Sequence, residues 1–132
     1  MSPALRVLLA DDAAEMRALL RWALLRAPEG DAVAVEIAGE AADGSEALTM
    51  AVDLAPDVVV LDLQMPGPPP GELLKAMVAA APGVPVVTFS GFEPDLVAPA
   101  ECRLVALHIP KTTDLALVRA AIVDVARGAG GA

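Results

Sequence analysis

At four places in this 132-residue chain, a short apolar run ends in a side chain that carries a carboxylate, a hydroxyl or an amino group. They are Asp11 with Asp12, Asp62, Ser90 and Lys111. Three carboxylates brought together repel one another unless a cation is present, and Mg²⁺ binds one or two carboxylates with waters and phosphate oxygens. A lysine adds a positive charge for an anion, and a serine adds a hydroxyl donor. Together these groups are what phosphoryl transfer to a carboxylate needs, with Asp62 as the nucleophile.

These residues can meet only if the apolar runs are strands of one sheet. Runs typical of buried strands cover residues 5–10, 33–38, 58–61, 84–89 and 104–109. Helical patterns follow them at 13–25, 45–54 and 72–81, with a turn or two within 95–102 and a last helix capped by Thr112 or Thr113. This alternation predicts an α/β fold with a doubly wound parallel sheet and helices on both faces. The carboxyl ends of parallel strands share one edge, so the polar residues should converge there.

Local signals refine this prediction. Asp12 is placed to cap the first helix, and Trp22 is expected to be partly buried by helix packing. Four prolines and two glycines between residues 64 and 71 predict a stiff, extended loop. Pro94 and Pro99 should keep the fourth helix short or irregular.

Composition bounds the class of protein. Hydrophobic residues make up 56% of the chain, yet its apolar runs are far shorter than the roughly 18 to 20 residues that span a membrane. No signal peptide is visible. The net charge of −9 repels phosphate backbones, which argues against nucleic-acid binding by this domain alone. The single cysteine, Cys102, is expected to be a buried, inert thiol and suits a cytoplasmic location.

Five stretches of the chain carry a resemblance to a known family. They are VLLADD at 7–12, GEAADGSEAL at 39–48, VVVLDLQMPG at 58–67, PVVTFSG at 85–91 and IPK at 109–111. In this order they resemble the receiver domain of a bacterial two-component response regulator, over essentially the whole chain. The resemblance implies a flavodoxin-like, five-stranded parallel sheet with strand order 2-1-3-4-5. We expect the receiver domain to cover residues 1–127, with 128–132 as a flexible tail or the start of a linker.

The resemblance also implies a role for each matching residue. Asp62 matches the phosphoacceptor, and Asp11 and Asp12 match the acidic pair that holds Mg²⁺, one directly and one partly through water. The backbone carbonyl of Gln64 matches the remaining metal ligand. Ser90 matches the switch hydroxyl that moves toward the phosphoryl group, and Lys111 matches the lysine that pairs with that group.

Two further roles concern switching and lifetime. His108 stands three residues before the lysine, where an aromatic switch residue is common, although a core or surface histidine is the simpler interpretation. Gln64 and Phe92 stand two residues after Asp62 and Ser90, where side chains tune the access of water to the acyl phosphate. Apolar Phe92 is expected to hinder that water and lengthen the phosphorylated lifetime.

The family implies a sensor histidine kinase as phosphodonor. It also implies an output domain or partner that reads the fourth helix, fifth strand and fifth helix. A homodimer through the last helix and the fourth-helix region is a further hypothesis. On this basis the chain is not an enzyme, beyond catalysing its own phosphorylation and dephosphorylation.

Alternatives stay open from the sequence. Taken singly, the aspartates could be loop and capping residues, Ser90 a strand end and Lys111 a surface charge; their joint placement at four strand ends favours chemistry. A receiver-fold interaction module working without phosphorylation is the main alternative. A metal-dependent phosphohydrolase would want a general acid where Gln64 stands, and no GxxxxGK[ST] loop for nucleotides is present.

Overall fold

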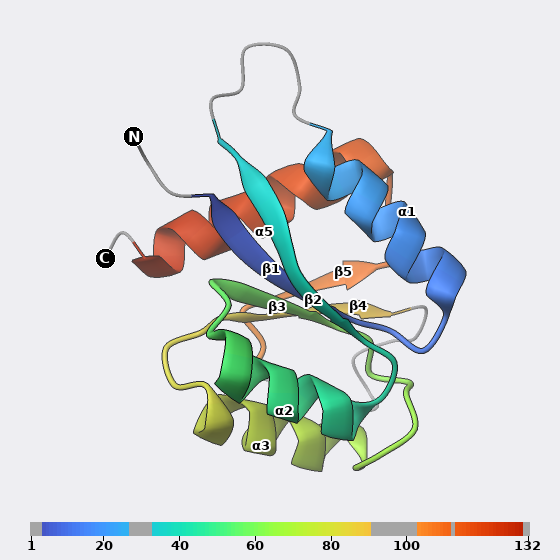
Figure 1. The fold of residues 1–132 in the computed structure, drawn as a ribbon, viewed down its shortest axis with the longest axis vertical. Helices are drawn as coiled ribbons and strands as arrows, with labels where there is room; N and C mark the ends of the chain where they lie inside the picture. The colour runs from blue at the N-terminus through green and yellow to red at the C-terminus, as the bar shows by residue number, and fades with distance from the viewer. Residues whose placement is uncertain (1–3, 27–32, 91–102, 112, 131–132) are drawn as a thin grey trace.

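The computed structural model describes residues 4–26, 33–90, 103–111 and 113–130, and these residues form one sheet between two layers of helices (Figure 1). The elements in chain order are β1 Leu5–Ala10, α1 Ala14–Leu25, β2 Val35–Ala41, α2 Gly44–Leu54, β3 Val58–Leu61, α3 Pro70–Ala80, β4 Val86–Ser90, β5 Leu107–Pro110 and α5 Leu115–Gly130. The sheet is entirely parallel with the order β2-β1-β3-β4-β5, which confirms the predicted fold. The short helix predicted within 95–102 lies outside the described residues.

The sheet separates two hydrophobic clusters, because successive strand residues point to opposite faces. The α2–α3 cluster joins those helices to one face of the sheet, through Leu8, Ala10, Ala47, Ala51, Val59, Leu61, Leu73, Leu74, Met77 and Val86 among others. The α1–α5 cluster covers the other face, through Val7, Leu9, Leu20, Leu24, Val58, Val60, Val87, Phe89, Val118 and Ile122 among others. All four residues of β3 are buried, as a central strand of a parallel sheet requires.

Several element boundaries differ from the sequence prediction. The second strand begins at Val35 rather than at residue 33, and the fifth begins at Leu107 rather than at 104. The third helix starts at Pro70 rather than at residue 72. Proline is tolerated in a first helical turn, because the backbone N–H that it lacks would have no partner within the helix. The last helix continues to Gly130, three residues beyond the predicted domain end. The domain boundary itself stays a prediction.

The predicted helix caps were partly wrong. Ala13, not Asp12, occupies the N-cap position of α1, and no side chain caps this helix. At α5 the capping group is Asp114, whose Oδ1 accepts the Ala116 N–H at 2.9 Å. Thr113 therefore does not serve as the cap, and Thr112 lies outside the described residues. In both places the chain enters the helix one residue later than the sequence pattern indicated.

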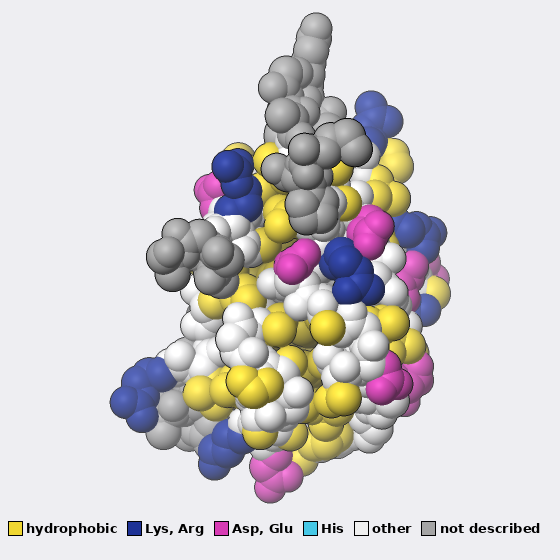
Figure 2. Space-filling model, turned by 60° about the vertical axis from the view of Figure 1, so that its left-hand side comes forward, with side chains coloured by type: hydrophobic (Ala, Val, Ile, Leu, Met, Phe, Trp, Pro, Cys, Tyr) yellow, Lys and Arg dark blue, Asp and Glu magenta, His cyan; other side chains and the backbone are white. Residues whose placement is uncertain are grey.

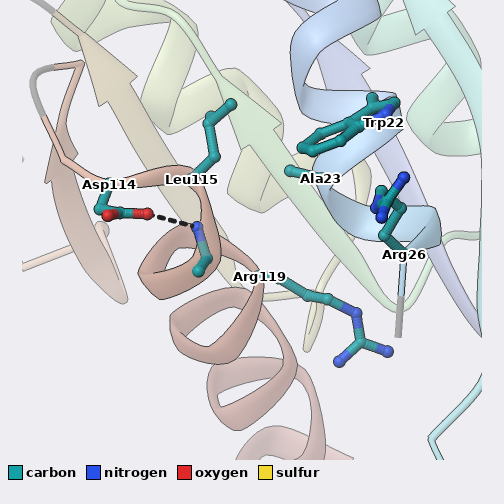
Figure 3. A pocket seen from close by; sticks show the side chains of 7 residues that line it. Trp22, Ala23, Arg26, Asp114, Leu115 and Arg119 are labelled. Atoms are coloured by element: carbon teal, nitrogen blue, oxygen red, sulfur yellow. Dashed lines mark hydrogen bonds between the residues drawn. The ribbon is translucent and has the colours of Figure 1, made fainter. Parts of the chain in front are cut away.

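Trp22, which the sequence predicts to be partly buried by helix packing, is 54% exposed. It lines a surface pocket between α1 and α5, where the Arg26 guanidinium lies 4.6 Å from its ring (Figure 3). Arg119, on the α5 side of this pocket, is buried and donates to the carbonyls of Leu24 at 3.1 Å and Val33 at 2.9 Å. It therefore ties α5 to the end of α1 and to the approach to β2.

Figure 2 shows the side of the molecule on which the strands begin. On this face, acidic and basic side chains lie intermixed with exposed hydrophobic atoms, and the described residues form no continuous basic surface there. Within the described part of the chain, no helix is both long and apolar enough to cross a membrane. Cys102 lies outside the described residues.

Candidate functional site

Asp11 and Asp62 lie side by side because the strands that carry them are paired in register. Ala10 of β1 pairs with Leu61 of β3, and the Asp62 N–H donates to the Ala10 carbonyl at 2.9 Å. Asp12 follows directly and is exposed. One carboxylate oxygen from each of the three aspartates lies within 4.8 Å of the others. The predicted acidic cluster is therefore present at the carboxyl edge of the sheet.

Each of the two buried aspartates is oriented by a bond from the backbone. Asp11 Oδ1 accepts the Ala13 N–H at 2.9 Å, and Asp62 Oδ1 accepts the Gln64 N–H at 2.9 Å. The Oδ2 atoms of both side chains then point toward Lys111. Its Nζ lies 3.1 Å from Asp11 Oδ2 and 3.2 Å from Asp62 Oδ2.

Lys111 reaches this edge because β5 lies beside β4. The Lys111 N–H donates to the carbonyl of Ser90, the last residue of β4, at 3.1 Å. Ser90 itself is buried, with 1% of its surface exposed. The side chain of Lys111 is 24% exposed, whereas those of Asp11 and Asp62 are 2% and 4% exposed. Lys111 is thus the most exposed of these three side chains.

The charges of the site perturb one another. Burial raises the pKa of Asp62 above its ordinary value; the neighbouring Asp11 charge adds to this, while the Gln64 N–H and Lys111 act against it. For Lys111, burial lowers the pKa, but the two carboxylates together outweigh burial and raise it above the ordinary value. Lys111 therefore stays charged. The Asp11 and Asp62 carboxylates repel each other, so holding them close together costs free energy.

The donor set fits a hard divalent cation. Asp11 Oδ2 is fully buried and, among the described residues, accepts no hydrogen bond of acceptable geometry, although Lys111 is within ion-pair distance. A buried carboxylate oxygen that accepts no well-formed hydrogen bond is costly, and a bound cation would reduce that cost. The three side chains that come together here in the described part of the chain are all carboxylates, which suit Mg²⁺ better than a softer metal.

The remaining predicted residues fall in different places. Gln64 is exposed and held next to Asp62 by its own N–H. His108 is half-buried on β5, and its Nδ1 is hydrogen-bonded to the Thr88 Oγ1 of β4 at 2.6 Å. It is thus anchored between strands rather than free at the surface. Phe92 lies outside the described residues.

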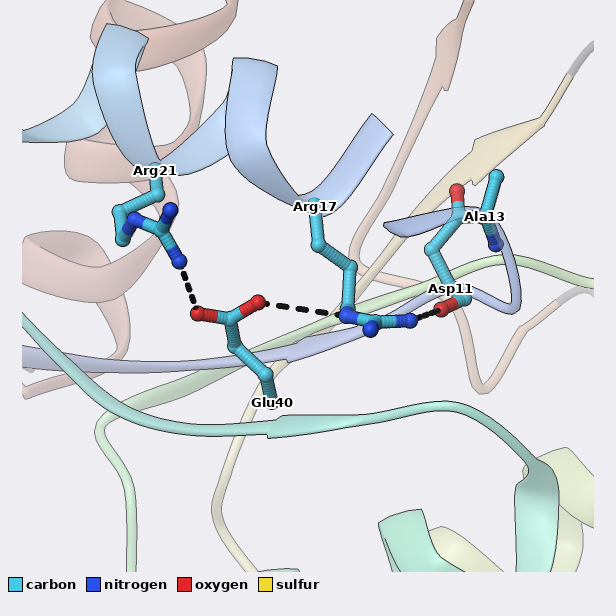
Figure 4. A network of polar contacts seen from close by, with 5 residues as sticks. All are labelled: Asp11, Ala13, Arg17, Arg21 and Glu40. Atoms are coloured by element: carbon cyan, nitrogen blue, oxygen red, sulfur yellow. Dashed lines mark hydrogen bonds and ion pairs between the residues drawn. The ribbon is translucent and has the colours of Figure 1, made fainter. Parts of the chain in front are cut away.

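Sequence reasoning missed a polar network on the other side of Asp11 (Figure 4). Arg17 of α1 donates to the Asp11 carbonyl at 2.6 Å and to Glu40 Oε1 at 3.2 Å. Arg21 pairs with Glu40 Oε2 at 2.5 Å. The four-residue spacing of the two arginines, which places them on one side of a helix, was the available signal. Thr88 was also missed, because a threonine inside an apolar strand looks like an ordinary strand residue.

The comparisons with known proteins agree with this geometry. The family model for the response regulator receiver domain matches residues 7–122. A protein-glutamate methylesterase/protein-glutamine glutaminase of Myxococcus xanthus is 43% identical over 118 residues, which cover 87% of this chain and 32% of that protein. A protein of the same name from Anaeromyxobacter dehalogenans is 46% identical over 87 residues, covering 65% of this chain and 23% of that protein. The chain thus spans about a third or less of these relatives.

Solved structures give the same result over nearly the full chain. The response regulator domain of Thermotoga maritima CheB has a TM-score of 0.77 at 28% identity, covering 98% of both chains. The REC domain of AraT, a response regulator from Geobacillus stearothermophilus, has a TM-score of 0.80 at 28% identity, again covering 98% of both. The chain belongs to the family of response regulator receiver domains.

Proposed function

We propose that this chain is a phosphorylation-controlled signalling switch, in which Asp62 accepts a phosphoryl group from a sensor histidine kinase in a Mg²⁺-dependent reaction. The observation that carries the proposal is the convergence of two buried Oδ2 atoms, from Asp11 and Asp62, on Lys111 Nζ. This convergence supports the proposal, because a nucleophilic carboxylate, a second acidic ligand and the positive charge of the lysine would all be within reach of one incoming phosphoryl group.

The roles divide by atom. Asp62 Oδ1 is engaged by the Gln64 N–H, so Oδ2 is the oxygen available to form the new P–O bond as the bond from phosphorus to the donor histidine breaks. Lys111 already contacts that oxygen and can pair with the added charge. Asp11, Asp12 and Asp62 would hold Mg²⁺ together with the Gln64 carbonyl. When bound, the ion supplies neutralisation of charge on the transferring group.

The proposed readout runs through the neighbouring strands. Ser90 ends β4 beside the site and receives the Lys111 N–H on its carbonyl, so it is placed to respond to a group added at Asp62. His108 is joined to the same strand through Thr88. We propose Ser90 and His108 as the switch residues, and Gln64 and Phe92 as the residues that tune phosphoryl lifetime.

The output is proposed to lie outside the receiver, in a further domain or a separate partner, so that the chain acts only on its own Asp62. The relatives support this because the matched part covers 32% or 23% of their length, and they are methylesterases by name. The single cysteine supports a cytoplasmic setting. We propose no nucleic-acid or membrane contact for this domain alone. Homodimerisation stays a prediction, which light scattering with and without a phosphoryl mimic would test.

The test is phosphorylation with a small-molecule phosphodonor and Mg²⁺, followed by intact and peptide mass spectrometry. The wild type should gain one phosphoryl group, on the peptide containing Asp62, and should gain none when EDTA removes the metal. Asp62→Asn should gain none. Asp53→Asn, which changes an exposed aspartate of α2, is the matched control and should behave as the wild type.

Two outcomes would reject the proposal. One is a wild type that takes up no phosphoryl group under these conditions. The other is full uptake by Asp62→Asn, which would place the chemistry at another residue. If the Asp62→Asn variant still produces the full output, the chain is instead an interaction module that works without phosphorylation.

A further inference from the structure

We propose that Arg17 is a positioning residue for the metal site, acting through the main chain of Asp11. This inference rests on the proposed function, because it assigns a residue to the metal-dependent step. Arg17 does not reach the carboxylate cluster itself; its guanidinium donates to the Asp11 carbonyl at 2.6 Å. A short, charge-assisted bond of this kind holds the acceptor more strongly than a neutral one.

Asp11 is held from three directions, and Arg17 supplies one of them. The Asp11 N–H donates to the Ala41 carbonyl of β2 at 3.0 Å, which continues the ladder of the sheet. Its Oδ1 accepts the Ala13 N–H at 2.9 Å. With the carbonyl held by Arg17, the residue has no free backbone group and its Oδ2 is left pointing at Lys111 and Asp62. Loss of the third bond lets the chain turn at the start of the β1–α1 connection, which redirects Oδ2.

Glu40 fixes the guanidinium that makes this bond (Figure 4). It stands near the end of β2, in register with Leu9 of β1, and its two carboxylate oxygens take one arginine each. The Arg17 side chain is 19% exposed and that of Glu40 is 27% exposed, so solvent competes little for this pair. Arg21 is more open, at 47%, and pairs only with Glu40 among the contacts described. Arg17 alone therefore links the network to Asp11.

The two arginines provide a matched comparison. Both lie on α1 and both pair with Glu40, so replacing either removes one charge and one ion pair. Only Arg17 also holds Asp11. Arginine is required for both contacts at once, because its planar group presents several donors in a fixed fork, whereas lysine presents a single ammonium group. A purely structural network predicts equal effects of Arg17→Gln and Arg21→Gln on the metal site.

The experiment titrates MgCl₂ into ¹⁵N-labelled protein and takes the dissociation constant from backbone amide shifts, without any phosphorylation. Arg17→Gln should weaken Mg²⁺ binding on the order of tenfold, as removal of a group that orients a metal ligand typically does. Arg21→Gln should bind within about twofold of the wild type, since its partner does not touch the metal ligands. Thermal unfolding in EDTA separates a loss of fold from a loss of the metal site.

Equal weakening in both variants, or wild-type affinity in a folded Arg17→Gln, would overturn the inference. If Arg17→Gln does not fold, Arg17→Met, which keeps the aliphatic stem but has no donor, takes its place, and wild-type Mg²⁺ affinity in that folded variant overturns the inference equally. Failure of the proposed function has a different signature, because the wild type itself then binds no Mg²⁺ and accepts no phosphoryl group. That result would remove the inference together with the function on which it rests.

Discussion

Asp11 and Asp62 each commit one carboxylate oxygen to a backbone N–H and present the other to Lys111. The committed oxygen orients the side chain, and the remaining one is available for chemistry. Because both groups are buried, their mutual repulsion is screened little by solvent, and Lys111 compensates only part of it. Without a bound metal, the protein therefore keeps unfavourable electrostatic repulsion at Asp62, the proposed phosphoacceptor.

The burial of Asp62 and this repulsion should together appear as a pH-dependent stability. The pKa of Asp62 is raised above 3.8, so the folded state binds more protons than the unfolded state between 3.8 and the folded pKa. Stability contributed by this group is therefore present at low pH and lost as pH rises through that window. We expect Asp62→Asn to be more stable than the wild type at neutral pH in EDTA, and the difference to shrink as pH falls.

Urea unfolding of both proteins from about pH 8 to about pH 4.5 measures this difference. Lys111 does not confuse the comparison. Its raised pKa means that its stabilisation is complete below 10.5 and is lost only as pH rises through the folded pKa, outside the range measured. A difference between the two proteins that widens on acidification would contradict the expectation.

The convergence of the candidate site residues could be predicted from the sequence because each of them follows a recognisable apolar run. Asp62 follows four buried residues, and parallel pairing then brings Asp11 and Lys111 to it. The role of Arg17 could not be predicted in this way, because its partner is a backbone carbonyl, which no sequence pattern marks. The Asp12 cap was wrong because the chain turns one residue later than the pattern suggests.

Among the elements, the loop from Gln64 to Pro69 is held against the start of α2. The Gly44 N–H donates to the Pro66 carbonyl at 3.0 Å, and the next residue, Gly67, adopts a φ of +123°. A Cβ on Gly67 would lie 3.2 Å from the Gly44 nitrogen. The loop that follows the proposed phosphoacceptor is thus fixed by close backbone contact as well as by its prolines.

We expect Gly67→Ala to destabilise the fold by about 1 to 3 kcal/mol, because it combines an unfavourable φ with a crowded contact. Gly83→Ala is the matched control: Gly83 also has a positive φ, of +82°, but a Cβ there would meet nothing within 4 Å. The loss of stability in Gly83→Ala should be smaller, since only the unfavourable backbone conformation contributes to it. Urea unfolding of both variants measures the difference, and equal losses would show that the contact with Gly44 contributes nothing.

The sequence predicted most elements but not their exact ends. Strands and helices were visible from the spacing of apolar residues, which tertiary packing preserves. The proline-rich segment was read as a loop through residue 71, yet Pro70 opens α3, because its ring is tolerated in the first turn. The start of β5 was also misplaced, since apolar Leu104 and Val105 pack against the α2–α3 cluster without joining the sheet.

At the scale of the whole molecule, the order β2-β1-β3-β4-β5 puts the strands that carry Asp11 and Asp62 in the middle of the sheet. β4, with Ser90, and β5, leading to Lys111, complete the same edge. The chain thus gathers residues from four separate segments on a sheet whose two faces are covered by helices (Figure 1). A rigid support of this kind suits a site whose chemistry depends on small distances.

Among the described residues, the two buried clusters on either side of the sheet have no member in common, so free energies of substitution should add across it. Ile122→Val in the α1–α5 cluster and Val86→Ala in the α2–α3 cluster should sum to within about 0.5 kcal/mol in the double variant. Ile122→Val with Val118→Ala, one turn away on α5, should depart further from additivity. Denaturant unfolding of the single and double variants measures the coupling free energy of both pairs. Strong coupling across the sheet would refute the expectation. Each side of this receiver can therefore accumulate substitutions independently of the other.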